Sequence, residues 1–167
     1  MKKLSVSLLV FLFAAATQAQ KNPSSISTGA SIGPKKGALV IVGGGSIPQS
    51  IREKFIALAG GTDARIVYIP TAAEDQYLSR QTGDESPRLF GLKNVTVIHT
   101  RDRKEANTEK FVAPLRKASG VWFGGGRQWR LVDSYLDTLT HKELLAVLGR
   151  GGVIGGSSAG ATIQGSY

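Results

Sequence analysis

Short apolar runs alternate along this chain with segments whose apolar residues recur at helical spacing. The runs are rich in valine and isoleucine and end at glycine or polar residues, which predicts β-strands. Strands are expected at 38–42, 66–69, 95–98, 121–123 and 153–154. The segments between them predict helices within 46–60, 108–118, 128–136 and 140–149, and another helix starts at 159. The polar stretch 74–88 is expected to be partly helical.

This repeated order of strand and helix predicts an α/β fold. Parallel strands joined through helices need right-handed crossovers, which place helices on both faces of the sheet. We therefore expect a three-layer, doubly wound, mostly parallel sheet over residues 37–167, with no room for a second domain. The continuous apolar run Ala38–Val42 predicts a first strand that is buried on both faces.

Capping residues indicate where the helices begin. Ser46 is expected to cap the first helix, and Thr140 with Glu143 has the spacing of a capping box. Pro114 is expected either to kink its helix or to mark the true start of that helix.

The first 19 residues have the pattern of a signal peptide. Lys2 and Lys3 precede an apolar stretch, and Thr17–Ala19 supplies the small residues of a cleavage site. Residues 20–36, rich in Ser, Gly, Pro and Lys, predict a flexible lead-in. We expect export to the periplasm or the extracellular space, with no stable membrane insertion after cleavage; an uncleaved anchor is the alternative.

The amino-acid composition excludes several kinds of site and partner. With 167 residues and no cysteine, the chain excludes a disulfide scaffold, a zinc ribbon, an iron–sulfur site and a thiol nucleophile. Only two histidines are present, and we expect neither a metal nor an organic cofactor. The net charge of +9 comes from scattered basic residues, which indicates a solvated surface and no nucleic-acid partner.

The glycine run after the first strand does not fit a dinucleotide site. Pro48 stands where the third glycine of G-x-G-x-x-G would fall, and Thr71 stands after the second strand in place of an acid. Asp63 lies at about the right distance in the sequence but precedes that strand. A tight turn between strand and helix is the better interpretation.

Residues 156–160 carry the strongest chemical signal. They fit G-x-S-x-G directly after a buried strand and at the start of a helix, as in a nucleophile elbow. Ser158 is then the candidate nucleophile, with Ala159 N–H as an oxyanion donor. The alternatives are a glycine turn in which Ser158 only caps a helix, and an elbow in which Ser157 is the nucleophile.

A second glycine turn follows the fourth strand. If the fourth and fifth strands are neighbours, this turn lies at the same edge of the sheet as Ser158, where open α/β folds bind ligands. The N–H groups of Gly125 and Gly126 could then approach a substrate carbonyl, and Gln128 could bond the substrate. The alternative is a turn that only begins a helix.

The segments Phe123–Gln128 (FGGGRQ) and Gly155–Ala161 (GGSSAGA) together resemble the cyanophycinase and aspartyl dipeptidase (peptidase E) family of serine peptidases. Residues 38–45 and 66–72 resemble the first two strands of that family. The resemblance implies a flavodoxin-like fold similar to class I glutamine amidotransferases. It also implies a Ser-His-Asp/Glu triad that cleaves peptide or isopeptide bonds next to aspartate. Arg127 departs from the acid that cyanophycinases often carry, which leaves the exact substrate open.

The resemblance implies that Ser158 is the nucleophile, that Ala159, Gly125 and Gly126 lie in the oxyanion region, and that Gln128 lies in the substrate pocket. The triad histidine and acid are expected beyond residue 167, so the sheet is expected to be incomplete at its carboxyl end and the 167-residue chain to be inactive.

His99 and His141 are the only histidines available as a base for Ser158, and neither is expected to serve. A lipase or esterase with the same elbow, and a non-catalytic binding domain, are the alternative functions. The expected partner is a peptide of the aspartyl-dipeptide type, and homodimerisation is left open.

Overall fold

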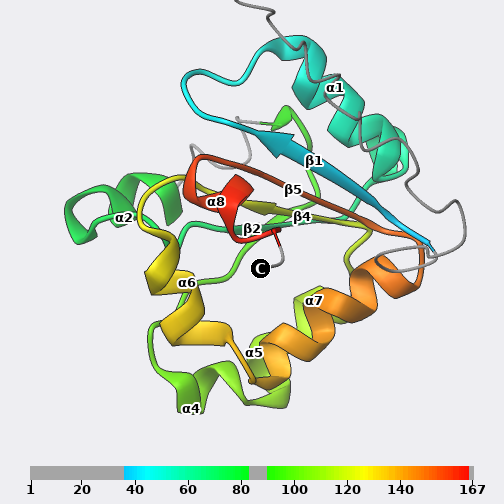
Figure 1. Ribbon diagram of the computed structural model, residues 1–167. Coiled ribbons are helices and arrows are strands. Elements are labelled where there is room, and N and C mark those ends of the chain that lie inside the picture. The colour runs from blue at the N-terminus through cyan, green and yellow to red at the C-terminus, as the bar shows by residue number, and fades with distance from the viewer. Residues whose placement is uncertain (1–35, 83–89, 166–167) are drawn as a thin grey trace, which may run out of the picture. The chain divides into compact units, whose positions relative to one another are not determined.

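The computed structural model describes residues 36–82 and 90–165 of the chain (Figure 1). The predicted signal peptide and all but the last residue of the predicted lead-in lie outside these residues. In chain order the elements are β1 (Ala38–Val42), α1 (Gln49–Leu58), the 3-10 helix η1 (Gly61–Asp63), β2 (Ile66–Ile69), α2 (Asp75–Thr82), β3 (Val95–Val97), α4 (Arg103–Ala106), α5 (Glu109–Lys117), β4 (Gly120–Phe123), α6 (Gln128–Tyr135), α7 (Leu139–Gly149), β5 (Val153–Ser157) and α8 (Ala159–Thr162).

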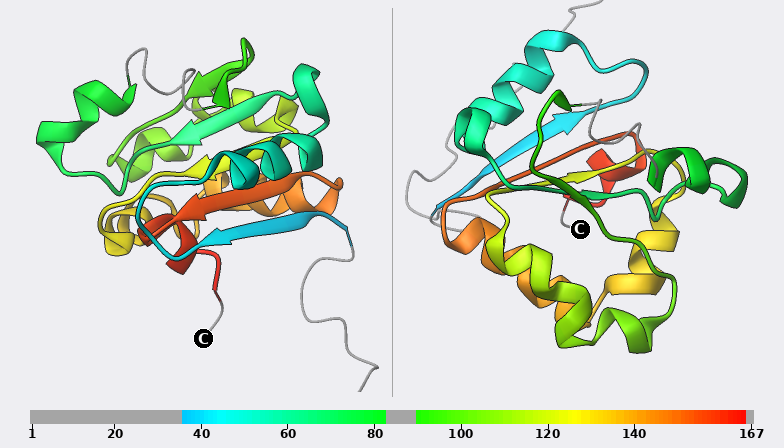
Figure 2. Two further views of the ribbon diagram at one scale, coloured as in Figure 1. Left: turned by 90° about the horizontal axis from the view of Figure 1, so that it is seen from above. Right: turned by 180° about the vertical axis from the view of Figure 1, so that it is seen from behind.

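The five strands form one parallel sheet in the order β1-β5-β4-β2-β3. In Figure 1, α1 lies above the sheet, and α5 and α7 lie below it. The two further views in Figure 2 show the same arrangement of helices on both faces. The predicted three-layer α/β fold is therefore confirmed.

Two apolar clusters cover the two faces of the sheet. On the α1 face, Phe55, Phe90 and Trp122 pack together, and the Phe55 and Trp122 rings meet edge to face with their centroids 5.0 Å apart. Gly155 of β5 provides room for this cluster, since a Cβ there would lie 2.5 Å from the Trp122 ring. The other face is filled by side chains from α5, α6 and α7, with Val112, Leu115 and Val147 among the most buried.

The first strand differs from its prediction. β1 pairs only with β5 within the described sheet, so it is an edge strand. Its side chains alternate: Val40 packs against the cluster below α1, whereas Leu39 and Ile41 are 47% and 61% exposed on the other face. The expectation of a strand buried on both faces is therefore wrong. An apolar sequence does not reveal whether a strand lies at the centre or the edge of a sheet, or whether both of its faces are covered.

Two helix starts also differ from their predictions. Thr138, not Thr140, caps α7: its hydroxyl accepts from the N–H of His141, at 3.4 Å. Thr140 is buried inside the helix and donates to the carbonyl of Ala106, at 2.7 Å. A tertiary acceptor therefore takes the hydroxyl that the local pattern assigned to a cap.

The helix α1 begins at Gln49, after Pro48 in an extended conformation, so Ser46 does not cap it. In α5 the cap is Thr108, whose hydroxyl accepts from the N–H of Phe111, and the helix continues through Pro114. Pro114 is therefore neither the start nor the end of its helix.

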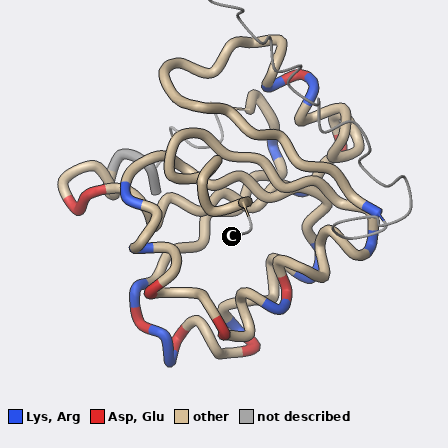
Figure 3. Tube along the Cα trace, viewed as in Figure 1, with Lys and Arg blue, Asp and Glu red and all other residues tan. Residues whose placement is uncertain are grey.

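Charged residues of both signs lie along the helices and connecting loops, as Figure 3 shows. Arg116 of α5 illustrates the pattern: it pairs with Glu109, two helical turns earlier on the same face, at 2.5 Å, and with Glu143 of α7, at 3.1 Å. Exposed pairs of this kind contribute little stability, about 0–1 kcal/mol each. Across the described ranges, every helix is too short or too polar to span a bilayer.

Candidate active site

Ser158 joins β5 to α8 in a strained backbone conformation. Its φ of 52° and ψ of −115° fall in a region that L-residues rarely occupy, and it is one of two non-glycine residues with positive φ among those described. The strand stops at Ser157 and the helix begins at Ala159, so the chain reverses within one residue and leaves the Ser158 side chain exposed. This is the backbone geometry of a nucleophile elbow.

The flanking glycines explain the spacing of the motif. A Cβ at Gly156 would lie 2.4 Å from the carbonyl oxygen of Gly160, and a Cβ at Gly160 would lie 2.3 Å from the carbonyl oxygen of Phe123. Real Cβ atoms do not approach backbone atoms this closely. The elbow therefore closes only when both positions lack a side chain.

The two serines of the motif occupy different environments. Ser157 is the last residue of β5, pairs with Val42 of β1 and is partly buried. The Ser158 N–H donates to the Val42 carbonyl at 2.9 Å, which fixes the register of the turn. The exposed hydroxyl at the bend is thus that of Ser158, as the central position of the motif predicts.

The glycine turn, Gly124–Arg127, lies beside the elbow. β4 and β5 are neighbours, with Phe123 opposite Gly156, so both turns leave the same edge of the sheet. A Cβ built at Gly125 would lie 3.6 Å from the Ser158 Cβ. The structure therefore brings together the two motifs that the sequence analysis singled out.

Backbone N–H groups of two segments belong to the turns beside Ser158. Ala159 is the first residue of α8, and the N–H groups of a first helical turn have no acceptor within their own helix. Gly125 and Gly126 add the N–H groups of the glycine turn, and Gln128 is exposed at the start of α6. A carbonyl oxygen that turns into an oxyanion would be stabilised by such donors.

The turn Pro70–Ala73, here called the support turn, lies directly against the glycine turn. The N–H of Arg127 donates to the Ala72 carbonyl at 2.8 Å, and the Arg130 guanidinium donates to the same oxygen at 3.2 Å. Gly126 has a φ of 139° and no room for a Cβ, which would lie 2.0 Å from that oxygen. The position of the glycine turn is thus set by a contact with Ala72.

Neither histidine reaches Ser158. His99 follows β3, which is separated from β5 by β4 and β2. Three strand spacings of about 4.8 Å place it roughly 14 Å along the sheet edge from the elbow. His141 lies in the first turn of α7, where its Nδ1 accepts from the N–H of Asp137 at 3.3 Å. Within the described ranges, Ser158 therefore has no histidine as a base.

His99, which is partly buried, instead contacts the buried Thr71 and Tyr135 in a polar cluster that the sequence analysis did not find. Its Nδ1 lies 2.9 Å from the Thr71 hydroxyl, which lies 2.6 Å from the Tyr135 hydroxyl. Burial, and then the neighbouring Arg101 guanidinium, lower the pKa of His99, while burial raises the pKa of Tyr135. The sequence analysis noted residues 66–72, which include Thr71, for their resemblance to a strand of the peptidase family. No local signal linked Thr71 to His99 or Tyr135, which lie 28 and 64 residues further along the chain.

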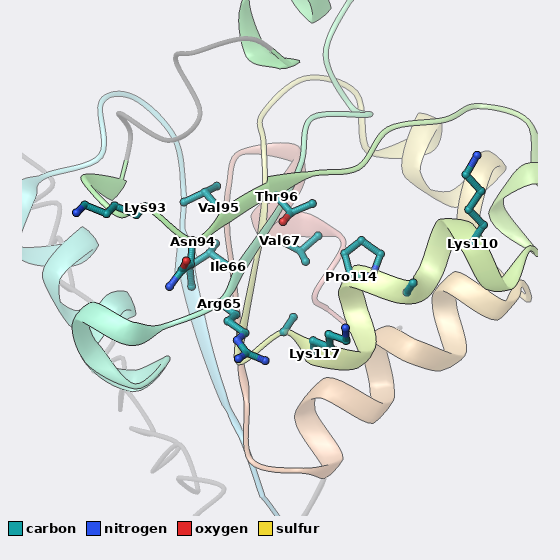
Figure 4. Close-up of a pocket in the computed structure, with 12 residues that line it drawn as sticks. Arg65, Ile66, Val67, Lys93, Asn94, Val95, Thr96, Lys110, Pro114 and Lys117 are labelled. Carbon is teal, nitrogen blue, oxygen red and sulfur yellow. The ribbon is translucent and has the colours of Figure 1, made fainter.

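A groove with a volume of about 650 Å³ lies away from these residues, between β3 and α5 (Figure 4). It is lined by Arg65 and Asn94, which precede β2 and β3, and by Lys117, which precedes β4. These positions are at the amino ends of the strands, opposite the edge that carries Ser158, so the groove does not form part of the candidate site. In the described part of the chain, no group of three or more metal-ligating side chains could hold a metal ion.

Comparison with known proteins gives concordant matches. A sequence model described as peptidase family S51 matches residues 39–167. Cyanophycinases from Geminocystis herdmanii and a Nostoc species are 29% and 31% identical over 79% of this chain, which covers 50% and 46% of their lengths. The crystal structure of a peptidase from an acI-B1 actinobacterium has a TM-score of 0.62 at 25% identity, over 74% of this chain and 54% of that one. The chain thus spans about half the length of the curated relatives it matches.

Proposed function

This chain belongs to peptidase family S51, and we propose from that premise that it carries the nucleophile of a serine peptidase that hydrolyses peptide or isopeptide bonds next to aspartate. The observation that carries the proposal is the backbone of Ser158. A φ of 52° followed at once by a helix start has a cost in stability, and such strain at a nucleophile position is typical of an active site.

The reaction follows from the arrangement of the two turns. Ser158 Oγ attacks the scissile carbonyl carbon while its proton passes to a histidine base, and the carbonyl oxygen becomes an oxyanion. The N–H groups of Ala159, Gly125 and Gly126 stabilise that oxyanion, and Gln128 bonds the substrate. The base then protonates the leaving amine, and water hydrolyses the acyl-enzyme in a second step.

The base and its acid come from outside the described residues in this proposal. The resemblance to the peptidase family puts both after the nucleophile, in sequence beyond residue 167. Because a serine hydroxyl needs a base within hydrogen-bond reach, we expect the 167-residue chain alone to be inactive.

The preference for aspartate rests on the family resemblance and on the charge beside the glycine turn. Arg127 is exposed next to Gly126, and Arg130 lies one helical turn further on. A guanidinium pairs well with a carboxylate, so a cationic rim favours an aspartyl substrate over a neutral one.

Covalent labelling tests the nucleophile in a full-length protein that contains this chain. Ser158→Ala should abolish labelling by a serine-reactive phosphonate and lower turnover by several orders of magnitude. Ser157→Ala is the matched control and should keep most of both, losing a hydrogen bond worth about 1 kcal/mol at most. Label retained in Ser158→Ala and lost in Ser157→Ala would contradict the proposal.

Substrate assays separate the peptidase from the alternative functions. The full-length protein should cleave an aspartyl dipeptide faster than the same dipeptide with asparagine, and faster than a short-chain ester. Preferential ester cleavage would indicate an esterase. Binding of the dipeptide without turnover would indicate a non-catalytic binding domain.

We also propose that the protein is exported, because residues 2–19 have the n-region, apolar stretch and cleavage site of a signal peptide. N-terminal sequencing of protein recovered outside the cytoplasm of its native host should begin near Gln20. Recovery of protein that still begins at Met1, in the cytosol, would contradict export.

A further inference from the structure

The support turn reaches into the core through the Thr71 side chain, and the Arg101 guanidinium donates to its Ala73 carbonyl at 2.7 Å. The N–H of Ala73 donates to the Pro70 carbonyl at 2.8 Å and closes the turn. Thr71, inside the turn, is fully buried, and its hydroxyl lies within hydrogen-bond distance of both His99 and Tyr135. The turn therefore faces the core through Thr71 and faces the glycine turn through the Ala72 carbonyl.

These hydrogen bonds are fully satisfied in only one direction. The Tyr135 oxygen accepts from the N–H of Thr100 at 3.3 Å, and among the described contacts the Thr71 oxygen, at 2.6 Å, is the acceptor within reach of the Tyr135 proton. Thr71 accepts that proton and must place its own on an acceptor, and His99 Nδ1 is within reach at 2.9 Å. The chain of donors thus runs from Thr100 through Tyr135 and Thr71 to an unprotonated Nδ1 of His99.

We propose that His99, Thr71 and Tyr135 form a directional hydrogen-bond chain that holds the support turn, and through it the glycine turn, in position beside Ser158. His99 is then a positioning residue in its Nε2–H tautomer, and its protonation releases the support turn. This deepens the proposed function, on which its catalytic consequence rests.

Protonation of His99 has a defined effect on this chain. With protons on both ring nitrogens, His99 can only donate, and the two buried hydroxyls of Thr71 and Tyr135 are left with one proton that has no acceptor. A buried donor without an acceptor is unfavourable, so the Thr71 side chain shifts and the Ala72 carbonyl moves with it. The charged groups around the imidazole are Arg101 on its own segment, Asp75 of α2 and Glu105 of α4, in addition to Tyr135 of α6.

The Arg127 amide proton reports on the support turn independently of activity, because it donates to Ala72. In a full-length protein that contains this chain, His99→Leu should raise the hydrogen-exchange rate of this amide about fivefold, the effect of losing one hydrogen bond. His99→Asn should keep the exchange rate within twofold of the original, because an Asn oxygen can replace Nδ1 as an acceptor. His141→Leu and His141→Asn are the matched controls and should leave the Arg127 amide unchanged.

A pH titration supplies a second measurement that does not depend on the fold of a variant. The protection factor of the Arg127 amide should fall as His99 becomes protonated and should stay level in His99→Asn. Ring-nitrogen NMR should show Nε2 protonated and Nδ1 unprotonated at neutral pH. A protonated Nδ1 at neutral pH, or an Arg127 amide indifferent to both His99→Leu and acid, would overturn the proposal.

In the full-length protein, His99→Leu should lower kcat more than it raises KM, and His99→Asn should restore kcat. If the Arg127 amide responds as expected but the unmodified full-length protein hydrolyses no peptide, the proposed function fails and the positioning chain stands. If the protein is an active peptidase and the amide does not respond, only the positioning chain fails.

Discussion

Replacing Ser158 by glycine should stabilise the protein relative to replacing it by alanine. The backbone at this position has φ 52° and ψ −115°, the mirror image of an extended conformation, which glycine adopts freely and alanine does not. The Ser158 side chain is exposed and makes no capping hydrogen bond, so both substitutions remove the hydroxyl at little cost. The two variants therefore differ mainly in backbone strain.

The magnitude of the difference follows from two opposing effects. Holding a residue with a Cβ in a sparsely populated region costs about 1–3 kcal/mol, which glycine relieves. Glycine also has a more flexible unfolded state than alanine, which costs about 0.5–1 kcal/mol. We expect the free energy of unfolding of Ser158→Gly to be about 0–2.5 kcal/mol higher than that of Ser158→Ala.

Urea unfolding at neutral pH, analysed with equal m-values, measures this difference. The control is the same pair of substitutions at Ser157, which has ordinary strand backbone in β5. There glycine should be less stable than alanine by about 0.5–1 kcal/mol, so the sign reverses between adjacent residues. A Ser158→Ala variant more stable than Ser158→Gly would show that the elbow stores no strain.

Three further outcomes are expected in the same unfolding assay. Gly160→Ala should lose about 1–3 kcal/mol or more, because its Cβ would lie 2.3 Å from the Phe123 carbonyl oxygen; a loss below 0.5 kcal/mol would contradict the tight elbow. Thr140→Val should lose about 1–2 kcal/mol, because it leaves the buried Ala106 carbonyl without its donor, and an unchanged midpoint would refute that role. Burial lowers the pKa of His99 below the 6.5 of a free imidazole, so the folded state binds fewer protons than the unfolded state. The contribution of His99 to stability should therefore be complete above pH 6.5 and be lost as the pH falls through the folded-state pKa. His99→Asn should remove this part of the pH dependence, and an identical pH profile in that variant would contradict it.

Local signals in the sequence predicted much of the fold and of the elbow. All five strands lie within three residues of their predicted ends, because runs of β-branched residues between glycine turns depend on few distant contacts. The elbow was also predictable, because the demand for glycine at 156 and 160 is made by atoms of the same turn and of the neighbouring strand.

Features that depend on distant partners were not predictable. The support turn is anchored through Thr71, whose partners His99 and Tyr135 lie 28 and 64 residues away. The exposure of Leu39 and Ile41 depends on what packs against that face of β1, which the hydropathy of the strand does not encode. Thr140 was assigned to a cap because the tertiary acceptor of its hydroxyl, on α4, is invisible in the local sequence.

The position of β1 has a consequence for the order in which this domain folds. Ala38 pairs with Val153, more than a hundred residues later, and the Ser158 turn is fixed by the carbonyl of Val42. At about 5–20 residues per second, a ribosome needs roughly 5–25 s to make the chain between these partners. During that time β1 has no strand to pair with, and closing so long a loop is a slow, entropically costly step. The candidate nucleophile therefore reaches its strained conformation only after β5 has been made and has paired with β1.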